Sequence, residues 1–175
     1  MNRAELAIAI NHVARLKGEF RLRSGAVSNE YFDKYRFESD PPLMAIIAAE
    51  LAALVPADVE VLAGLELGGV PIATLLSQQT GLPTAFVRKA AKSYGTARLA
   101  EGAEVGGHRV LLVEDVVTSG GQAVESATAL RGLGAEIRCA VCVIDREAGG
   151  RANLSAAGIE LRALFRRAEL EASAA

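Results

Sequence analysis

Two adjacent acidic residues, Glu114 and Asp115, stand near the end of an apolar run, and a loop suited to binding an anion follows them. The stretch reads VLLVEDVVTSGGQ over residues 110–122. Glycines allow backbone N–H groups to turn toward a ligand, hydroxyl groups add donors, and the start of a following helix attracts negative charge. The candidate phosphate loop comprises Thr118, Ser119, Gly120, Gly121 and Gln122.

The two carboxylates restrict the kind of phosphate that this loop would bind. A carboxylate beside a phosphate repels it, so Glu114 and Asp115 should serve another part of the ligand, either sugar hydroxyls or a shared Mg²⁺ ion. The implied ligand is a sugar phosphate. In the structural alternative, a Ser or Thr side chain caps the helix and the glycines only form a turn. The nucleotide motifs G-x-x-x-x-G-K-[ST] and G-x-G-x-x-G are absent.

A basic segment suggests how such an anion could be neutralised. Arg88, Lys89, Lys92 and Arg98 occur within residues 86–98 without an acidic neighbour, although the chain has a net charge of −2. This balance favours a small anionic ligand over nucleic acid or anionic lipid. A solvated basic surface is the structural alternative.

Arg146 is a further candidate, because it directly follows another apolar run in the stretch IDREAGG. An arginine in this position could bind a carboxylate of a ligand. The alternative is a surface ion pair with Asp145 or Glu147.

The elements that would position these residues follow from the apolar pattern. Strands are expected over residues 59–64, 84–89, 109–116, 136–145 and 159–165. Helices are expected over residues 2–17, 39–55, the second part of 65–81, and 119–134. Residues 20–37 should form strand, turn and strand, and residues 90–107 a long polar segment. Strands alternating with helices predict an α/β fold with a parallel sheet, whose ligands lie beyond the carboxyl ends of the strands. All the candidate residues lie at or just after such ends.

Composition sets further bounds. With 51% hydrophobic and 23% charged residues, the 175-residue chain should be globular and form a single domain over residues 1–175. The first 20 residues lack the apolar core of a signal peptide, and no apolar run reaches the roughly 18 residues of a membrane span. We therefore expect a cytoplasmic protein with no membrane partner. Cys139 and Cys142 lie three apart in an expected strand and so point to opposite faces, which favours buried thiols over a metal or redox pair.

The stretch VLLVEDVVTSGG resembles the signature of the type I phosphoribosyltransferases that binds 5-phosphoribosyl 1-diphosphate (PRPP). In that signature, apolar residues lead into two acids, two apolar residues and a threonine-containing phosphate loop. Over about residues 18 to 150, the chain is most similar to the orotate phosphoribosyltransferases. The matching segments are FRLRSGAVSNEYFDKYRF, GLELGGVPIA, VRKAAKSYG and DREAGG, in the family's order and spacing.

The resemblance implies the type I phosphoribosyltransferase fold, with a mostly parallel central sheet flanked by helices. About residues 1–40 would form a small N-terminal hood that contributes to binding the base. The implied activity is that of a pentosyltransferase, which transfers the phosphoribosyl group of PRPP to orotate in pyrimidine biosynthesis.

The resemblance also implies roles for individual residues. Glu114 and Asp115 would hold the ribose hydroxyls, and the phosphate loop would surround the 5'-phosphate. The implied PRPP-binding residues are Glu114, Asp115, Val116, Val117, Thr118, Ser119, Gly120, Gly121 and Gln122, together with Arg88, Lys89 and Lys92. The last three match the catalytic basic residues of a loop, here residues 88–102, that acts across the subunits of a homodimer. Residues 66–69 would approach the diphosphate through their backbone.

For orotate, the resemblance implies that Arg146 grips the carboxylate and that Thr118 lies beside the pyrimidine. The implied cofactor is Mg²⁺, held mainly by PRPP, and Glu114 and Asp115 could assist. Three positions depart from the pattern of many relatives: Tyr94 replaces a histidine, Arg23 replaces a lysine, and Leu67-Gly68 replaces a Tyr-Lys pair.

Two other functions stay open from the sequence. The first is a phosphoribosyltransferase for another nucleobase. The second is a non-catalytic regulator that senses PRPP and binds nucleic acid. The basic segment and the negative net charge both argue against the regulator.

Overall fold

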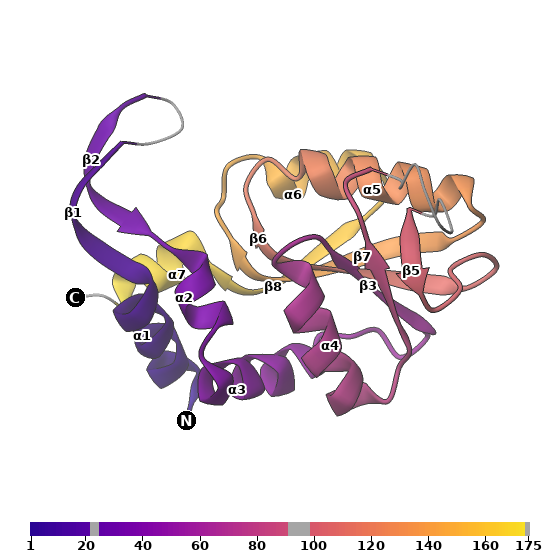
Figure 1. The fold of residues 1–175 in the computed structure, drawn as a ribbon, viewed down its shortest axis with the longest axis horizontal. Helices are drawn as coiled ribbons and strands as arrows, with labels where there is room; N and C mark the ends of the chain where they lie inside the picture. Colours follow the sequence, from indigo (N-terminus) through magenta and orange to yellow (C-terminus); the bar gives the residue numbers. More distant parts are fainter. Residues whose placement is uncertain (22–24, 91–98, 174–175) are drawn as a thin grey trace.

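The computed structural model describes residues 1–21, 25–90 and 99–173 and shows a sheet with helices on both faces (Figure 1). The strands are β1 (Arg15–Arg21), β2 (Val27–Phe32), β3 (Val61–Leu65), β4 (Thr84–Val87), β5 (Ala100–Gly102), β6 (Arg109–Val117), β7 (Glu136–Asp145) and β8 (Glu160–Arg166). The helices are α1 (Arg3–Ala14), α2 (Lys34–Glu38), α3 (Pro41–Ala52), α4 (Gly69–Thr80), α5 (Gly121–Gly132), α6 (Gly150–Ala156) and α7 (Arg167–Ala172).

The main sheet has the strand order β5-β4-β3-β6-β7-β8. All neighbouring pairs from β4 to β8 are parallel, and only the short edge strand β5 runs antiparallel, against β4. The predicted mostly parallel sheet is therefore confirmed. Because parallel strands all end at the same edge, the loops after β3, β4, β6 and β7 meet there.

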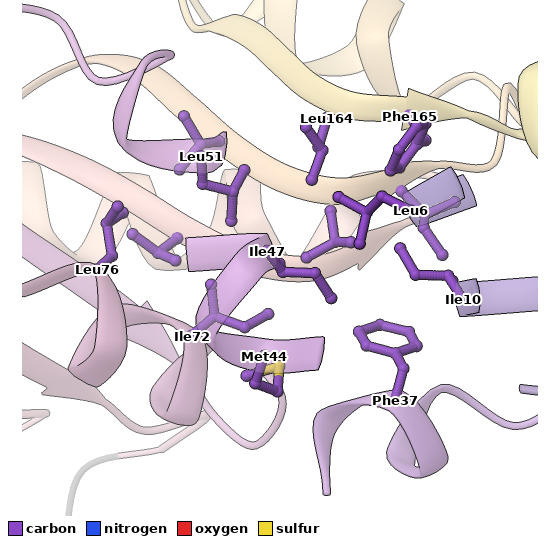
Figure 2. Packing of buried hydrophobic residues seen from close by; sticks show 14 of the residues in the cluster. Leu6, Ile10, Phe37, Met44, Ile47, Leu51, Ile72, Leu76, Leu164 and Phe165 are labelled. Atoms are coloured by element: carbon purple, nitrogen blue, oxygen red, sulfur yellow. The ribbon is translucent and has the colours of Figure 1, made fainter. Parts of the chain in front are cut away.

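A hydrophobic core lies on each face of this sheet. Helices α1, α3 and α4 cover one face, where Leu6, Ile47 and Ile72 are fully buried with neighbours from β6 and β7 (Figure 2). Helices α5 and α6 cover the other face through residues such as Leu130 and Leu154. Such burial is the main favourable term in folding.

The two cysteines of β7 lie where the strand period places them. Cys139 packs into the core beneath α3, whereas Cys142 packs into the core beneath α5. Both are buried free thiols, as predicted. Burial raises the pKa of the Cys139 thiol to about 11, and burial also raises that of Cys142, so neither thiol is a ready nucleophile.

The N-terminal region differs from the prediction in two places. The first helix was expected over residues 2–17 but stops at Ala14, and Leu16 instead pairs with Tyr31 in the β1–β2 hairpin. Pairing with the next strand along the chain overrides the helical apolar pattern at this point. The second expected strand ends at Phe32. Asp33 then caps the short helix α2, accepting a hydrogen bond from Tyr35 N at 3.2 Å.

The hairpin β1–β2 projects from the body, and Figure 1 shows α1, α2 and α7 at its base. Helix α7 holds the start of the chain, since Arg3 pairs with Glu169 at 2.8 Å and Asn11 donates to Ser173 Oγ at 2.9 Å.

The sequence pattern did not predict α6, α7 or β5. Among the helices that the structure describes, none has both the length and the apolar character that crossing a membrane requires.

Candidate active site

The candidate site lies at the carboxyl edge of the sheet, where four loops converge. Residues 66–68 follow β3, residues 88–90 follow β4, residues 118–120 follow β6, and residues 146–149 follow β7. Sequence reasoning singled out these same four loops. The backbone links two of them, because Arg146 N donates a hydrogen bond to Val117 O at 2.8 Å.

The phosphate loop turns from β6 into α5 at Gly120. Gly120 is the N-cap of α5, with a left-handed φ of 73°, and offers no side-chain cap of its own. The structural alternative of a Ser or Thr cap is present only as one long hydrogen bond, in which Gly121 N donates to Ser119 Oγ at 3.5 Å. The Thr118 and Ser119 side chains are exposed beside the helix start. Asn153 of α6 steadies the turn by donating to Ser119 O at 2.8 Å.

A cavity of about 170 Å³ opens at this turn. Its lining residues are Glu114, Val116, Val117, Thr118, Ser119, Gly120, Gly121, Gln122 and Ala123. One carboxylate thus shares a cavity with the start of a helix and two hydroxyl groups. This arrangement suits a ligand that has both a phosphate and hydroxyl groups.

Asp115 has a different environment from Glu114. Its side chain is only 1% exposed, and Oδ2 accepts a hydrogen bond and ion pair from Lys34 Nζ of α2. The side chain of Glu38, one turn further along α2, also contributes to the electrostatic environment of Asp115. The expected pair of equivalent ribose-binding carboxylates is thus divided in this structure, because only Glu114 lines the cavity.

The electrostatics of this carboxylate cluster (Lys34, Glu38, Glu114 and Asp115) follow from burial and mutual hydrogen bonding. Burial, and then the neighbouring Asp115 carboxylate, raise the pKa values of Glu38 and Glu114. For Asp115, burial acts in the same direction, but hydrogen bonds from Glu38, Glu114 and Lys34 outweigh it and lower the pKa. In the ligand-free protein, Asp115 is therefore the carboxylate of the cluster that is charged most readily.

The loop after β3 packs directly against this cluster. A Cβ on Gly68 would lie 1.7 Å from Asp115 Oδ2, and one on Gly69 would lie 2.2 Å from Val113 O. Only glycines allow this close approach. Beside them, Glu66 Oε1 accepts a hydrogen bond from Lys89 N at 2.5 Å, which links this loop to the start of the basic segment.

The structure describes part of the basic segment. Arg88 continues from β4, and its N–H donates to Leu99 O at 2.9 Å, so the chain returns beside the point where it left. Lys89 is exposed and Arg88 is half-buried. Lys92, Tyr94 and Arg98 lie outside the described residues, as does Arg23 of the hood.

Arg146 lines a second and larger cavity, of about 410 Å³, between the hood and the end of β7. The cavity is bordered by Asn11, Arg15, Ser28, Glu30, Tyr31, Phe32, Ile144, Arg146, Arg167, Leu170 and Glu171. The structural alternative for Arg146 is not seen among the described residues. Asp145 pairs instead with Arg151 at 3.1 Å, and Glu147 accepts a hydrogen bond from Ala168 N at 3.0 Å.

Sequence reasoning missed Lys34, Glu38, Arg15 and Arg167. The spacing of Lys34 and Glu38 by four residues would have placed them on one helical face. The apolar pattern hides that signal, because it predicts strand, turn and strand over residues 20–37, which include Lys34. For Arg15 and Arg167, the cavity forms only when the two ends of the chain meet, and no local pattern carries that information.

Comparison with known proteins finds relatives along most of the chain. The family model of the phosphoribosyl transferase domain matches residues 39–156. A protein named orotate phosphoribosyltransferase from Nocardioides sp. is 51% identical over 170 residues, covering 97% of this chain and 95% of that protein. Its namesake from Methanocella arvoryzae is 43% identical over 153 residues, covering 87% of each.

Solved structures agree with this match. Orotate phosphoribosyltransferase from Mycobacterium tuberculosis H37Rv, in complex with Fe(III) dicitrate, superposes with a TM-score of 0.88 at 34% identity, covering 96% of this chain and 98% of that one. The same enzyme in complex with PRPP gives a TM-score of 0.84 at 31% identity, with 97% and 98% covered. Adenine phosphoribosyltransferase from Thermoanaerobacter pseudethanolicus, at 19% identity and a TM-score of 0.70, shares the fold.

Proposed function

This chain belongs to the phosphoribosyltransferase family, and from that premise we propose how its site performs the reaction of an orotate phosphoribosyltransferase. The reaction transfers the phosphoribosyl group of PRPP to orotate and yields orotidine 5'-monophosphate and diphosphate, a step of de novo pyrimidine biosynthesis. A bond forms between a ring nitrogen of orotate and C1 of the ribose, and the bond from C1 to the diphosphate oxygen breaks.

The phosphate loop binds the 5'-phosphate. The observation that carries this assignment is the start of α5 at Gly120, a residue without a side chain to cap the helix, which opens onto a cavity shared with Glu114. Backbone N–H groups of the first helical turn and the hydroxyl groups of Thr118 and Ser119 donate hydrogen bonds to the phosphate oxygens.

Glu114 contacts the ribose hydroxyls from within the same cavity. Asp115 stands beside it on β6, paired with Lys34. To bind the sugar as well, the Asp115 carboxylate would have to accept hydrogen bonds from both Lys34 and the ligand. Carboxylate oxygens suit this task because they accept hydrogen bonds from hydroxyl groups.

The basic segment neutralises the leaving diphosphate. Breaking the C1–O bond produces an oxocarbenium-like state, and the barrier falls when negative charge on the departing group is stabilised. Arg88 and Lys89 at the end of β4, together with Lys92, are the candidates for this role. Residues 66–69 approach the diphosphate through backbone groups, since Gly68 and Gly69 leave no side chain between loop and cluster.

Mg²⁺ is proposed as the cofactor. The donor set fits this ion, because Mg²⁺ is usually held by one or two carboxylates plus substrate phosphates and water. Glu114, which faces the cavity, is the available carboxylate, and Asp115 could assist only if it shares its bond to Lys34. When bound, the ion stabilises negative charge on the diphosphate.

Orotate is proposed to bind between the phosphate loop and the hood. Arg146 faces the large cavity and lacks an ion-pair partner among the described residues, so its guanidinium is available for the orotate carboxylate. Thr118, at the end of β6, stands beside the pyrimidine. A base without a carboxylate would have less use for Arg146.

A homodimer is also part of the proposal, with the basic segment of one subunit acting at the site of its partner. The basic segment begins at the end of β4 and is followed by β5, and these two strands form one edge of the sheet. A cytoplasmic location is proposed with it.

The decisive assay mixes pure protein with PRPP, Mg²⁺ and orotate and follows the loss of orotate absorbance. We expect turnover that depends on all three components. Turnover with a different nucleobase, but not with orotate, would overturn the base assignment. Binding of PRPP without any turnover would favour a regulator.

A further inference from the structure

Lys34 joins the hood to the strand that carries the two acidic residues. It belongs to α2, yet its Nζ donates to Asp115 Oδ2 of β6, 81 positions away in the chain. The Lys34 side chain is 32% exposed, whereas that of Asp115 is 1% exposed. A partly exposed lysine therefore supplies the ion-pair partner of a fully buried carboxylate.

Asp115 is fixed from two directions. On one side it contacts Lys34, and on the other its Oδ2 occupies the position where a Gly68 side chain would begin, 1.7 Å from the ideal Cβ. A carboxylate held between a hood helix and the loop after β3 has little freedom to move. Glu114, the preceding residue of β6, lines the ligand cavity. Holding Asp115 in place therefore also restrains the backbone that carries Glu114.

The charge of Lys34 matters to an anionic substrate. PRPP carries phosphate and diphosphate groups, and the site offers it two adjacent carboxylates with a third, Glu38, nearby. The loop of residues 66–69 provides no cation. Lys34 pairs with Asp115, offsetting its negative charge, whereas an unpaired buried carboxylate would be costly and would repel the phosphates.

We propose that Lys34 is a positioning residue for phosphoribosyl transfer: it holds Asp115 in place and offsets its charge, so that PRPP can bind beside Glu114. The inference rests on the proposed function of the site. Lys34 acts through Asp115 and does not touch the reacting atoms, so its removal should affect PRPP more than orotate.

The test compares Lys34→Met, Lys34→Gln and Lys34→Arg by steady-state kinetics, with thermal unfolding measured for each variant. Lys17→Met is the matched control, because Lys17 is an exposed lysine of the same hood, on β1. We expect Lys34→Met to raise the PRPP KM by about 10-fold or more, while the orotate KM stays within about 3-fold. Lys34→Arg should restore most of the PRPP affinity, since it keeps the charge.

Each outcome decides the inference. If Lys34→Met does not fold, Lys34→Gln carries the test, because its amide can still donate to Asp115. A folded variant with an unchanged PRPP KM overturns the inference, and so does an equal rise in both KM values. If neither neutral variant folds where Lys17→Met does, Lys34 is purely structural and the inference is wrong. If the wild-type protein and Lys17→Met do not turn over orotate, the proposed function fails instead.

Discussion

Glu114 and Asp115 are consecutive residues of β6, yet Glu114 lines the phosphate-loop cavity whereas Asp115 is buried against Lys34. Adjacent residues of a strand point to opposite sides, so one position can serve a ligand while the next braces the protein. This division of roles distinguishes the effects expected from changing each residue.

Glu114→Gln and Asp115→Asn should therefore differ in stability as well as in binding. Glu114→Gln should weaken PRPP binding by about 10-fold with little loss of stability, because its side chain lines the ligand cavity and its surroundings already favour the neutral form. Asp115→Asn should lower the free energy of unfolding by about 1–3 kcal/mol, because Lys34 loses its charged partner. Urea unfolding and calorimetric titration with PRPP measure the two effects, with exposed Glu125→Gln of α5 as control. Equal stability losses in both variants would contradict the division.

Arg146→Ala should impair orotate recognition selectively. We expect the orotate KM to rise by about 100-fold, since a charge-assisted pair worth about 1.5–3 kcal/mol is lost, while PRPP binding changes little. Arg138→Ala is the matched control, because Arg138 is an exposed arginine of β7, near the end of the strand opposite to Arg146. If Arg146→Ala binds orotate normally, the carboxylate of the substrate is recognised elsewhere.

The pH dependence of stability should reveal the carboxylate cluster. The pKa of Glu38 is raised from 4.5 to about 8, first by burial and then by Asp115. The folded protein holds that proton more tightly than the unfolded chain, so the stabilising contribution is complete below about 4.5 and is lost as the pH rises toward about 8. In buffer with a chelator, the unfolding temperature should fall across this range. Glu38→Gln should flatten the decline, and exposed Glu50→Gln of α3 should not. Parallel curves for all three proteins would show that Glu38 has no such role.

Hybrid dimers test whether the basic segment acts across subunits. A Lys92→Ala subunit and an Arg146→Ala subunit are each expected to be nearly inactive. Co-refolding the two should recover about a quarter of the wild-type activity per site, because half of the dimers are mixed and each mixed dimer has one intact composite site. No recovery, with mixed dimers verified by mass, would mean that the segment serves its own subunit.

The sequence was sufficient to predict the sheet and the position of the site. Apolar runs that end in acidic, basic or glycine residues predict strands such as β6 and β7. In a parallel sheet, the carboxyl ends of these strands lie at the same edge. The unpredicted features depend on pairings that the local apolar pattern does not encode. Leu16 continues a helical pattern but pairs with Tyr31, and Lys34 meets Asp115 only after the hood has folded onto the sheet. No local pattern specifies such pairings.

The proposed function depends most on binding of the 5'-phosphate at the turn around Gly120. Gly120 and Gly81 have nearly the same left-handed φ, 73° and 74°, but Gly81 ends α4 away from the phosphate loop and has open space around its Cβ position. Replacing either glycine with alanine should cost about 1 kcal/mol of stability, because alanine disfavours this conformation, and Gly120→Ala should cost more, since its Cβ would lie 3.1 Å from Gly150 O.

Calorimetric titration of PRPP into Gly120→Ala and Gly81→Ala, under conditions where both are folded, is the most direct measurement. We predict that Gly120→Ala binds PRPP at least about 10-fold more weakly than the wild-type protein, since the N–H groups of the turn must shift away from the phosphate. Gly81→Ala should bind PRPP with unchanged affinity. If both variants bind PRPP equally well, the 5'-phosphate does not lie in the turn after β6.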